Sequence, residues 1–102
     1  MEILLTGSTV TAAEAFRVGL VNRVVASGEL LASAEALAKK IMANAPLAVK
    51  FCLDAVNHGL NATQREGQVL EAAAFALCCG TEDMKEGIKA FQEKRPPQFG
   101  GK

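Results

Sequence analysis

The chain has 102 residues, which is enough for one small domain and too few for two. Half of the residues are apolar, yet there is no Trp or Tyr and only five Phe, so the composition favours closely packed helices over an aromatic core. Eleven basic and eleven acidic residues give a formal net charge of zero, which argues against a nucleic-acid partner held by bulk electrostatics.

The sequence shows no signal for a membrane or for secretion. Its apolar runs are far shorter than a membrane span, and Glu2 follows Met1 without a basic or long apolar leader. The three cysteines, Cys52, Cys78 and Cys79, are odd in number, which argues against a disulfide framework. We therefore expect a reducing compartment, the cytoplasm, or the mitochondrion if a transit peptide has been removed.

The first part of the chain predicts short helices and one extended segment. Gly7 ends an opening helical turn, and a chain that starts on such a turn is expected to have lost a preceding segment. Thr11 and Glu14 have the spacing of a capping box that starts a second short helix. The mostly apolar, β-branched residues 20–25 predict a short extended segment, which could pair briefly with residues 9–10.

Longer helices are predicted in the middle of the chain. One spans about residues 29–43, and Pro46 is well placed to begin the next, which ends near Gly59. A second capping box, Thr63-x-x-Glu66, opens a helix that closes at Gly80. We expect an all-α chain of four or five helices joined by short loops, with at most a minimal β pairing.

The helix pair over residues 29–59 carries more apolar surface than a chain of this length easily buries, and such a surplus marks an interface. The alternative is one self-contained bundle that buries all of it. The apolar faces of this pair are formed by Leu30, Leu37, Ile41, Val49, Leu53 and Val56.

The last helix has the clearest signals. Thr81 is a good N-cap, and Lys94 and Arg95 charge a final turn that Pro96-Pro97 cannot continue. A loose Pro/Gly tail over residues 96–102 is expected to follow. The apolar stripe of this helix consists of Met84, Ile88 and Phe91.

No residue of the chain is predicted to be catalytic or to bind a metal. The acidic cluster of Glu82, Asp83 and Glu86 is interleaved with lysines, so dipole complementation and i,i+3 ion pairs (Glu82 with Lys85, Glu86 with Lys89) without shifted pKa values explain it. The single histidine, His58, has no partners at ligand spacing. Phosphate-loop, nucleophile-elbow and HExxH motifs are absent.

Four stretches resemble the crotonase family, the enoyl-CoA hydratases and isomerases, in the family's order and spacing. They are LLTGSTVTAAEAFRVGLVNRVV from Leu4, ANAPLAVKFCLDAVN from Ala43, LEAAAFALCCGTEDMKEG from Leu70 and TEDMKEGIKAFQEKRPPQF from Thr81. The resemblance implies that residues 1–102 are one C-terminal helical domain, which packs on an N-terminal spiral domain and on neighbouring subunits in a trimer or hexamer. The family's catalytic carboxylates and oxyanion-hole amides lie in that spiral domain, which nothing here matches.

The resemblance also implies a coenzyme contact at three positions. Phe91 and Lys94 are three residues apart, so a ring and an ammonium group would share one helix edge about 5 Å apart along the axis. In the family such residues contact the adenine and 3′-phosphate end of CoA, and Phe75 matches an aromatic residue near the acyl-CoA of a neighbouring subunit. The alternative is that both Phe residues are core and Lys94 is a solvated charge.

The resemblance therefore implies part of an enoyl-CoA hydratase/isomerase-like lyase, with acyl-CoA as the substrate of the whole enzyme and no separate cofactor. This chain alone is expected to be inactive. The alternative is a stand-alone helical oligomerisation module, for which the capping boxes and Ala-rich faces would look the same.

Overall fold

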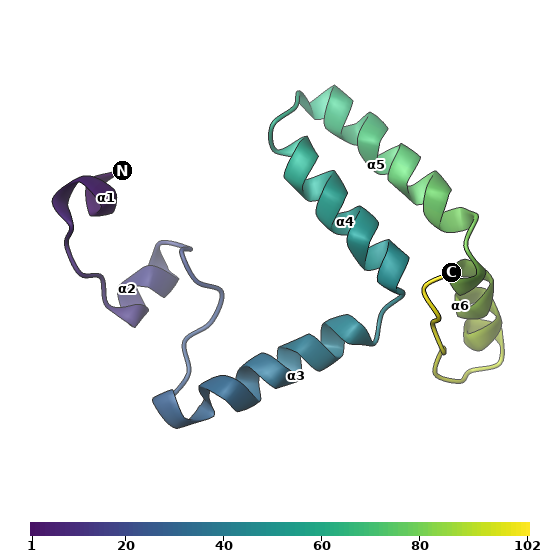
Figure 1. The fold of residues 1–102 in the computed structure, drawn as a ribbon, viewed down its shortest axis with the longest axis horizontal. Coiled ribbons are helices and arrows are strands. Elements are labelled where there is room, and N and C mark those ends of the chain that lie inside the picture. The colour runs from purple at the N-terminus through teal and green to yellow at the C-terminus, as the bar shows by residue number, and fades with distance from the viewer. The chain divides into compact units, whose positions relative to one another are not determined.

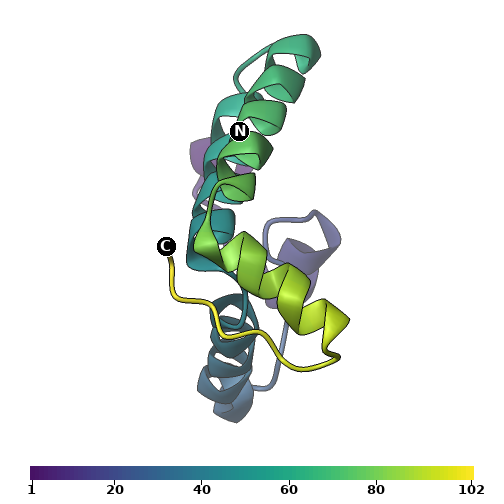
Figure 2. The ribbon, with the colours of Figure 1, turned by 90° about the vertical axis from the view of Figure 1, so that its right-hand side faces the viewer.

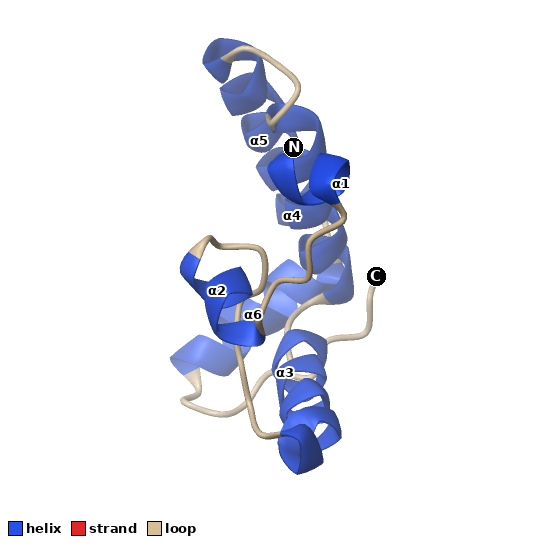
Figure 3. Cartoon of the chain, turned by 90° about the vertical axis from the view of Figure 1, so that its left-hand side faces the viewer, coloured by secondary structure: helices blue, strands red, loops and turns tan.

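The structure, a computed structural model, describes all of residues 1–102 and contains helices and loops but no strand (Figure 3). It has six α-helices, one more than the upper end of the predicted range, because the opening helical turn forms a helix of its own. They are α1 (Glu2–Thr6), α2 (Ala12–Arg17), α3 (Leu30–Met42), α4 (Pro46–Gly59), α5 (Gln64–Cys79) and α6 (Glu82–Gln92), with a 3₁₀ turn at Ser27–Glu29 before α3 (Figure 1). The chain forms two compact units, Met1–Ala36 and Leu37–Lys102.

In the first unit, local hydrogen bonds set the ends of the two short helices. Gly7 adopts the left-handed conformation (φ 64°), and its N–H donates to the carbonyl of Ile3, which ends α1 as predicted. Thr11 caps α2 by accepting the N–H of Glu14 at 3.2 Å. The Glu14 carboxylate binds Arg17 at 2.6 and 2.7 Å instead of returning to Thr11, so the predicted capping box is only half formed.

Residues 20–25 form no strand, so the brief pairing with residues 9–10 that the sequence allowed does not occur. The N–H groups of Leu20 and Val21 both donate to the carbonyl of Ala15, at 2.8 and 3.3 Å. These bonds close the end of α2, so the same amides are not available for a strand ladder.

In the second unit, α4 and α5 form a helical hairpin and lie side by side in Figure 1. Pro46 occupies the first turn of α4, and the capping box between Thr63 and Glu66 is complete, with both reciprocal hydrogen bonds present. Near the connecting loop the backbones approach closely, since a Cβ placed on Gly67 would lie 3.6 Å from the Cα of Gly59. The absence of side chains at both positions lets the two helices meet there.

The last helix and the chain end form a second local structure. Thr81 caps α6 by accepting the N–H of Met84 at 3.1 Å. The tail then turns back along α6 (Figure 2), and the carbonyl of Lys102 accepts the N–H groups of Glu82 and Asp83 at 2.8 and 3.3 Å. The prediction of a loose tail is therefore wrong.

Burial is sparse throughout the chain. Only Ala15, Ala90 and Asp83 are buried, and no large apolar side chain is. The alternative of one self-contained bundle that buries its apolar faces is therefore not realised. Exposed apolar side chains of the hairpin include Leu53, Val56, Leu60, Val69, Phe75 and Leu77.

No helix of the chain combines the length and the apolar character needed to cross a membrane.

Candidate functional site

The candidate site lies at the C-terminal end of α6, where Phe91 and Lys94 were predicted to act together. Phe91 is on the last turn of α6, and 86% of it is exposed. Lys94 lies two residues beyond the helix, which ends at Gln92, and its backbone is left-handed with φ 53°. The prediction that the two residues share one helix edge is therefore wrong.

A hydrogen-bonded cap explains why α6 ends early. The N–H of Lys94 donates to the carbonyl of Phe91 at 3.2 Å, and the N–H of Arg95 donates to the carbonyl of Ala90 at 3.0 Å. This pair of bonds is a Schellman motif, which needs a left-handed residue and most often uses Gly there. Here Lys94 occupies that position. Its side chain therefore extends from the turn that caps α6 and not from a face of the helix.

The aromatic residues of the predicted site are not core residues. Phe75 lies in α5, and 66% of it is exposed, while Phe91 is exposed even more. An open apolar hollow of about 470 Å³ includes Phe91 in its lining and does not include Phe75. The structure thus places Phe91 beside a hollow and leaves Phe75 separate from it.

Four segments of the second unit line this hollow, and the end of α5 contributes Cys78. Ala45 and Ala48 contribute at the start of α4, Ile88 and Phe91 on α6, and Phe99 in the tail. A flat or apolar group fits the chemistry of this lining better than a charged one.

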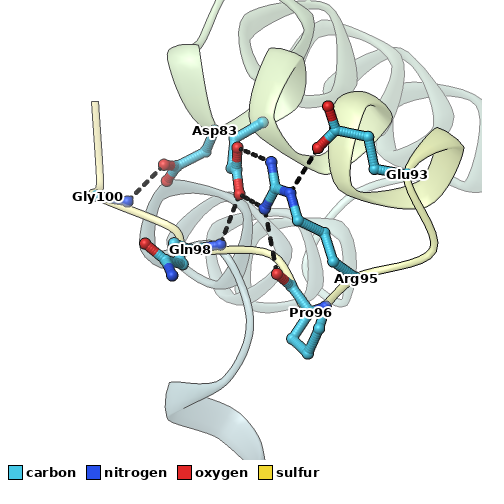
Figure 4. Close-up of polar contacts among 7 residues, drawn as sticks. Asp83, Glu93, Arg95, Pro96, Gln98 and Gly100 are labelled. Atoms are coloured by element: carbon cyan, nitrogen blue, oxygen red, sulfur yellow. Dashed lines mark hydrogen bonds and ion pairs between the residues drawn. The ribbon is translucent and has the colours of Figure 1, made fainter.

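An ion-pair cluster next to Lys94 fixes the tail and was not predicted. The Arg95 guanidinium donates to both carboxylate oxygens of Glu86, at 2.6 and 2.9 Å, and to Glu93 at 2.7 Å (Figure 4). Glu86 also accepts the N–H of Gln98 at 2.8 Å. The predicted Glu82–Lys85 ion pair is confirmed at 2.7 Å. The predicted ion pair between Glu86 and Lys89 is wrong, because Glu86 binds Arg95 instead.

The same contacts change the acidity of the cluster. Hydrogen bonds from Arg95 and, next, from the Gln98 N–H lower the pKa of Glu86 from an ordinary 4.5 to about 2. In turn the carboxylates of Glu86 and Glu93 raise the pKa of the Arg95 guanidinium. The prediction of unshifted pKa values in this acidic group is therefore wrong for Glu86. Its depressed pKa suits a permanent anion and not a proton donor near neutral pH.

Asp83 makes the second set of contacts to the tail. It is only 4% exposed and accepts the N–H groups of Gly100 and Gly101 at 2.7 and 2.9 Å (Figure 4). The sequence contains only a weak signal for this contact, namely an acidic first turn and a Gly-Gly pair 17 residues later. It did not show that the chain reverses direction between them.

The arrangement as a whole is suited to binding. The carboxylates of Asp83 and Glu86 are committed to backbone amides and to Arg95, and no group of His, Cys, Asp and Glu could hold a metal ion. All three cysteines are free thiols. The region around the end of α6 exposes the Phe91 ring, the apolar hollow and Lys94 on a hydrogen-bonded turn.

Comparisons with known proteins agree with this helical arrangement. The chain is 42% identical over 98 residues to crotonyl-CoA hydratase of Syntrophomonas wolfei, a match that covers 96% of this chain and 38% of that protein. It is also 42% identical over 94 residues to short-chain-enoyl-CoA hydratase of Clostridium acetobutylicum, covering 92% of this chain and 36% of the relative. The chain thus spans less than two fifths of the length of these relatives.

A solved structure gives the same result in three dimensions. The crystal structure of enoyl-CoA hydratase from Bacillus anthracis matches with a TM-score of 0.94 at 36% identity, over 99% of this chain and 39% of that one. The sequence matches the family described as enoyl-CoA hydratase/isomerase over residues 1–102. The chain therefore belongs to the enoyl-CoA hydratase/isomerase family.

Proposed function

We propose that this chain is the C-terminal helical part of an enoyl-CoA hydratase/isomerase-like enzyme, where it contributes to subunit assembly and to part of the CoA site. One observation carries the proposal: a chain that spans 38% of its relative's length leaves most of its large apolar side chains exposed and buries none of them. Such faces require cover from other protein surfaces, which the remaining length of an enzyme and its neighbouring subunits would supply.

The C-terminal placement is supported by what the chain contains. It has helices only, and the two acidic residues at the start of α6 that look most like catalytic groups bind the tail of the same chain. The family's catalytic carboxylates and oxyanion-hole amides belong to a spiral domain that this chain does not resemble. The spiral domain and this chain would be complementary parts of one enzyme.

The proposed CoA contact uses Phe91, Lys94 and Phe75. An exposed ring can cover adenine, and the Lys94 ammonium can neutralise the 3′-phosphate. Phe75, exposed on α5, would lie near the acyl-CoA of a neighbouring subunit. All three side chains are accessible, as such contacts require.

The whole enzyme would act on acyl-CoA thioesters. Two backbone amides would polarise the thioester carbonyl and stabilise an enolate, which is the largest contribution such a site makes to lowering the barrier. A stand-alone assembly module remains the second candidate, because the exposed apolar faces would serve it equally. The coding sequence upstream of Met1 separates the two, since a Gly-rich amide loop and two glutamates there would favour the enzyme.

Lys94→Ala in a chimera tests the proposed contact. In the chimera this chain replaces the matched 38% of the Syntrophomonas wolfei crotonyl-CoA hydratase. We expect the KM for crotonyl-CoA to rise about tenfold with a smaller fall in kcat, because a contact made equally in ground and transition states is worth about one charge-assisted hydrogen bond.

Lys85→Ala is the matched control, because Lys85 is an exposed lysine on α6, the helix that ends just before Lys94, and it forms an ion pair with Glu82. It should leave both kinetic constants unchanged. A collapsed kcat at constant KM in Lys94→Ala would contradict the proposed role of Lys94.

A further inference from the structure

The cap that ends α6 requires a left-handed residue at position 94, but it does not explain how a residue other than glycine is held there. Lys94 is the one residue other than glycine with positive φ in the chain, at 53°. L-residues adopt this conformation rarely, because Cβ comes too close to the following carbonyl oxygen. When such a residue persists, surrounding contacts hold it, and these residues gather at binding sites.

The contacts that hold Lys94 come from the residue that follows it. The Arg95 side chain donates to Glu86 at 2.6 and 2.9 Å, to Glu93 at 2.7 Å and to the Pro96 carbonyl at 3.2 Å (Figure 4). Its backbone N–H donates to the buried Ala90. Arg95 is therefore fixed at both backbone and side chain, and the turn before it cannot relax without breaking these bonds.

Glu86 holds the other side of the turn. It lies on α6 nine residues before Arg95 and also accepts the N–H of Gln98, three residues after Arg95. One carboxylate therefore joins the helix, the residue after Lys94 and the returning tail. Its side chain is 23% exposed and that of Arg95 34%, so water competes with this pair less than with the Lys85–Glu82 pair, at 69% and 68%.

From this geometry we infer that Glu86 and Arg95 are positioning residues that hold Lys94 in the left-handed turn from which its ammonium meets the coenzyme phosphate. The inference rests on the proposed function of Lys94 and adds two residues to it. A lysine on a flexible chain end would lose backbone freedom on binding, whereas one on a fixed cap loses only side-chain freedom. The pair itself need not touch the ligand.

The first arm of the test measures the turn in this chain. Glu86→Gln should move the ¹³Cα and ¹³Cβ shifts of Lys94 away from left-handed values and speed exchange of the Arg95 amide proton, while shifts over residues 82–90 remain helical. Arg95→Lys, which loses the two-pronged contact, should act in the same direction. Glu82→Gln is the control, because Glu82 contacts Lys85 and not the turn. A left-handed Lys94 that survives both variants would overturn the inference.

The second arm measures binding in the chimera with crotonyl-CoA and its 3′-dephospho analogue. Glu86→Gln should raise the KM for crotonyl-CoA about fivefold, a loss of the size of one hydrogen bond, and leave the KM for the analogue unchanged. In a Lys94→Ala background the same substitution should have no further effect.

The failures are distinguishable. If Lys94→Ala raises the KM but Glu86→Gln does not, the inference is wrong and the proposed function stands. Equal effects of Glu86→Gln on both esters would show a general structural defect and would also overturn the inference. If Lys94→Ala leaves both KM values unchanged, the proposed coenzyme contact itself is wrong.

Discussion

The α4–α5 hairpin and the α6–tail segment of the second unit are stabilised in different ways. In the hairpin α4 and α5 pack against each other, yet Leu53, Val69 and Leu77 remain 60–63% exposed. The α6–tail segment satisfies its polar groups internally, through Asp83 and Glu86. The segment with Phe91 and Lys94 thus satisfies its polar groups locally, whereas the hairpin, which carries Phe75, requires cover from another surface.

Removing Asp83 is expected to have the largest effect on the α6–tail segment. Asp83→Ala deletes the carboxylate that accepts the amides of Gly100 and Gly101, and hydrogen bonds to a charged group are worth about 1.5–3 kcal/mol. A loss of about 2 kcal/mol should speed hydrogen exchange of these two amides about thirtyfold. Asp54→Ala, at an exposed position on α4, is the control and should leave them unchanged. Unchanged exchange in Asp83→Ala would show that the tail is held by other contacts.

Acidification tests the same segment through Glu86. Its pKa is lower in the folded chain, about 2, than the ordinary 4.5, so its contribution to stability is fully present above pH 4.5. That contribution should disappear as the pH falls from about 4.5 to about 2. The amide shift of Gln98, followed by NMR, should titrate with a midpoint near 2, and the transition should be missing in Glu86→Gln. A midpoint near 4.5 would mean that Arg95 does not bind Glu86 in solution.

The smallest effect on this chain's own stability is expected on the hairpin. Leu53 is 60% exposed, so Leu53→Gln should change the free energy of unfolding of the isolated chain by less than about 0.5 kcal/mol. The same substitution in the chimera should weaken oligomer assembly, measured by sedimentation velocity, because Leu53 would then be covered by another surface. Asp54→Gln introduces the same side chain one position away and should leave assembly intact. Equal assembly in both variants would remove the hairpin face from the interface.

Local sequence patterns predicted most helix boundaries and failed for contacts over longer separations. The Thr63–Glu66 capping box and the Thr81 cap were predicted correctly, because their partners lie three residues apart within one turn. At Thr11 the same spacing gave only one of the two hydrogen bonds of a capping box. The Glu14 carboxylate binds Arg17, which is also three residues away, instead of the Thr11 backbone. A local pattern does not rank two partners that are equally near.

The tail contacts were missed for a geometric reason. The Arg95–Glu86 and Gly100–Asp83 contacts join residues nine and 17 positions apart, and both depend on a reversal at Lys94. That reversal needs a left-handed residue, a position that sequence patterns assign to Gly or Asn and not to Lys. The candidate residues Phe91 and Lys94 were predicted by resemblance, but the cap that separates them from one helix edge was not.

Steady-state hydration of crotonyl-CoA by the isolated chain and by the chimera tests the division of labour between this chain and the rest of an enzyme most directly. The Syntrophomonas wolfei hydratase with the matched 38% deleted serves as the inactive reference. We predict turnover by the chimera and none by the isolated chain, in which no residue is predicted to be catalytic. Turnover by the purified chain alone, or a folded chimera without activity, would contradict the proposal.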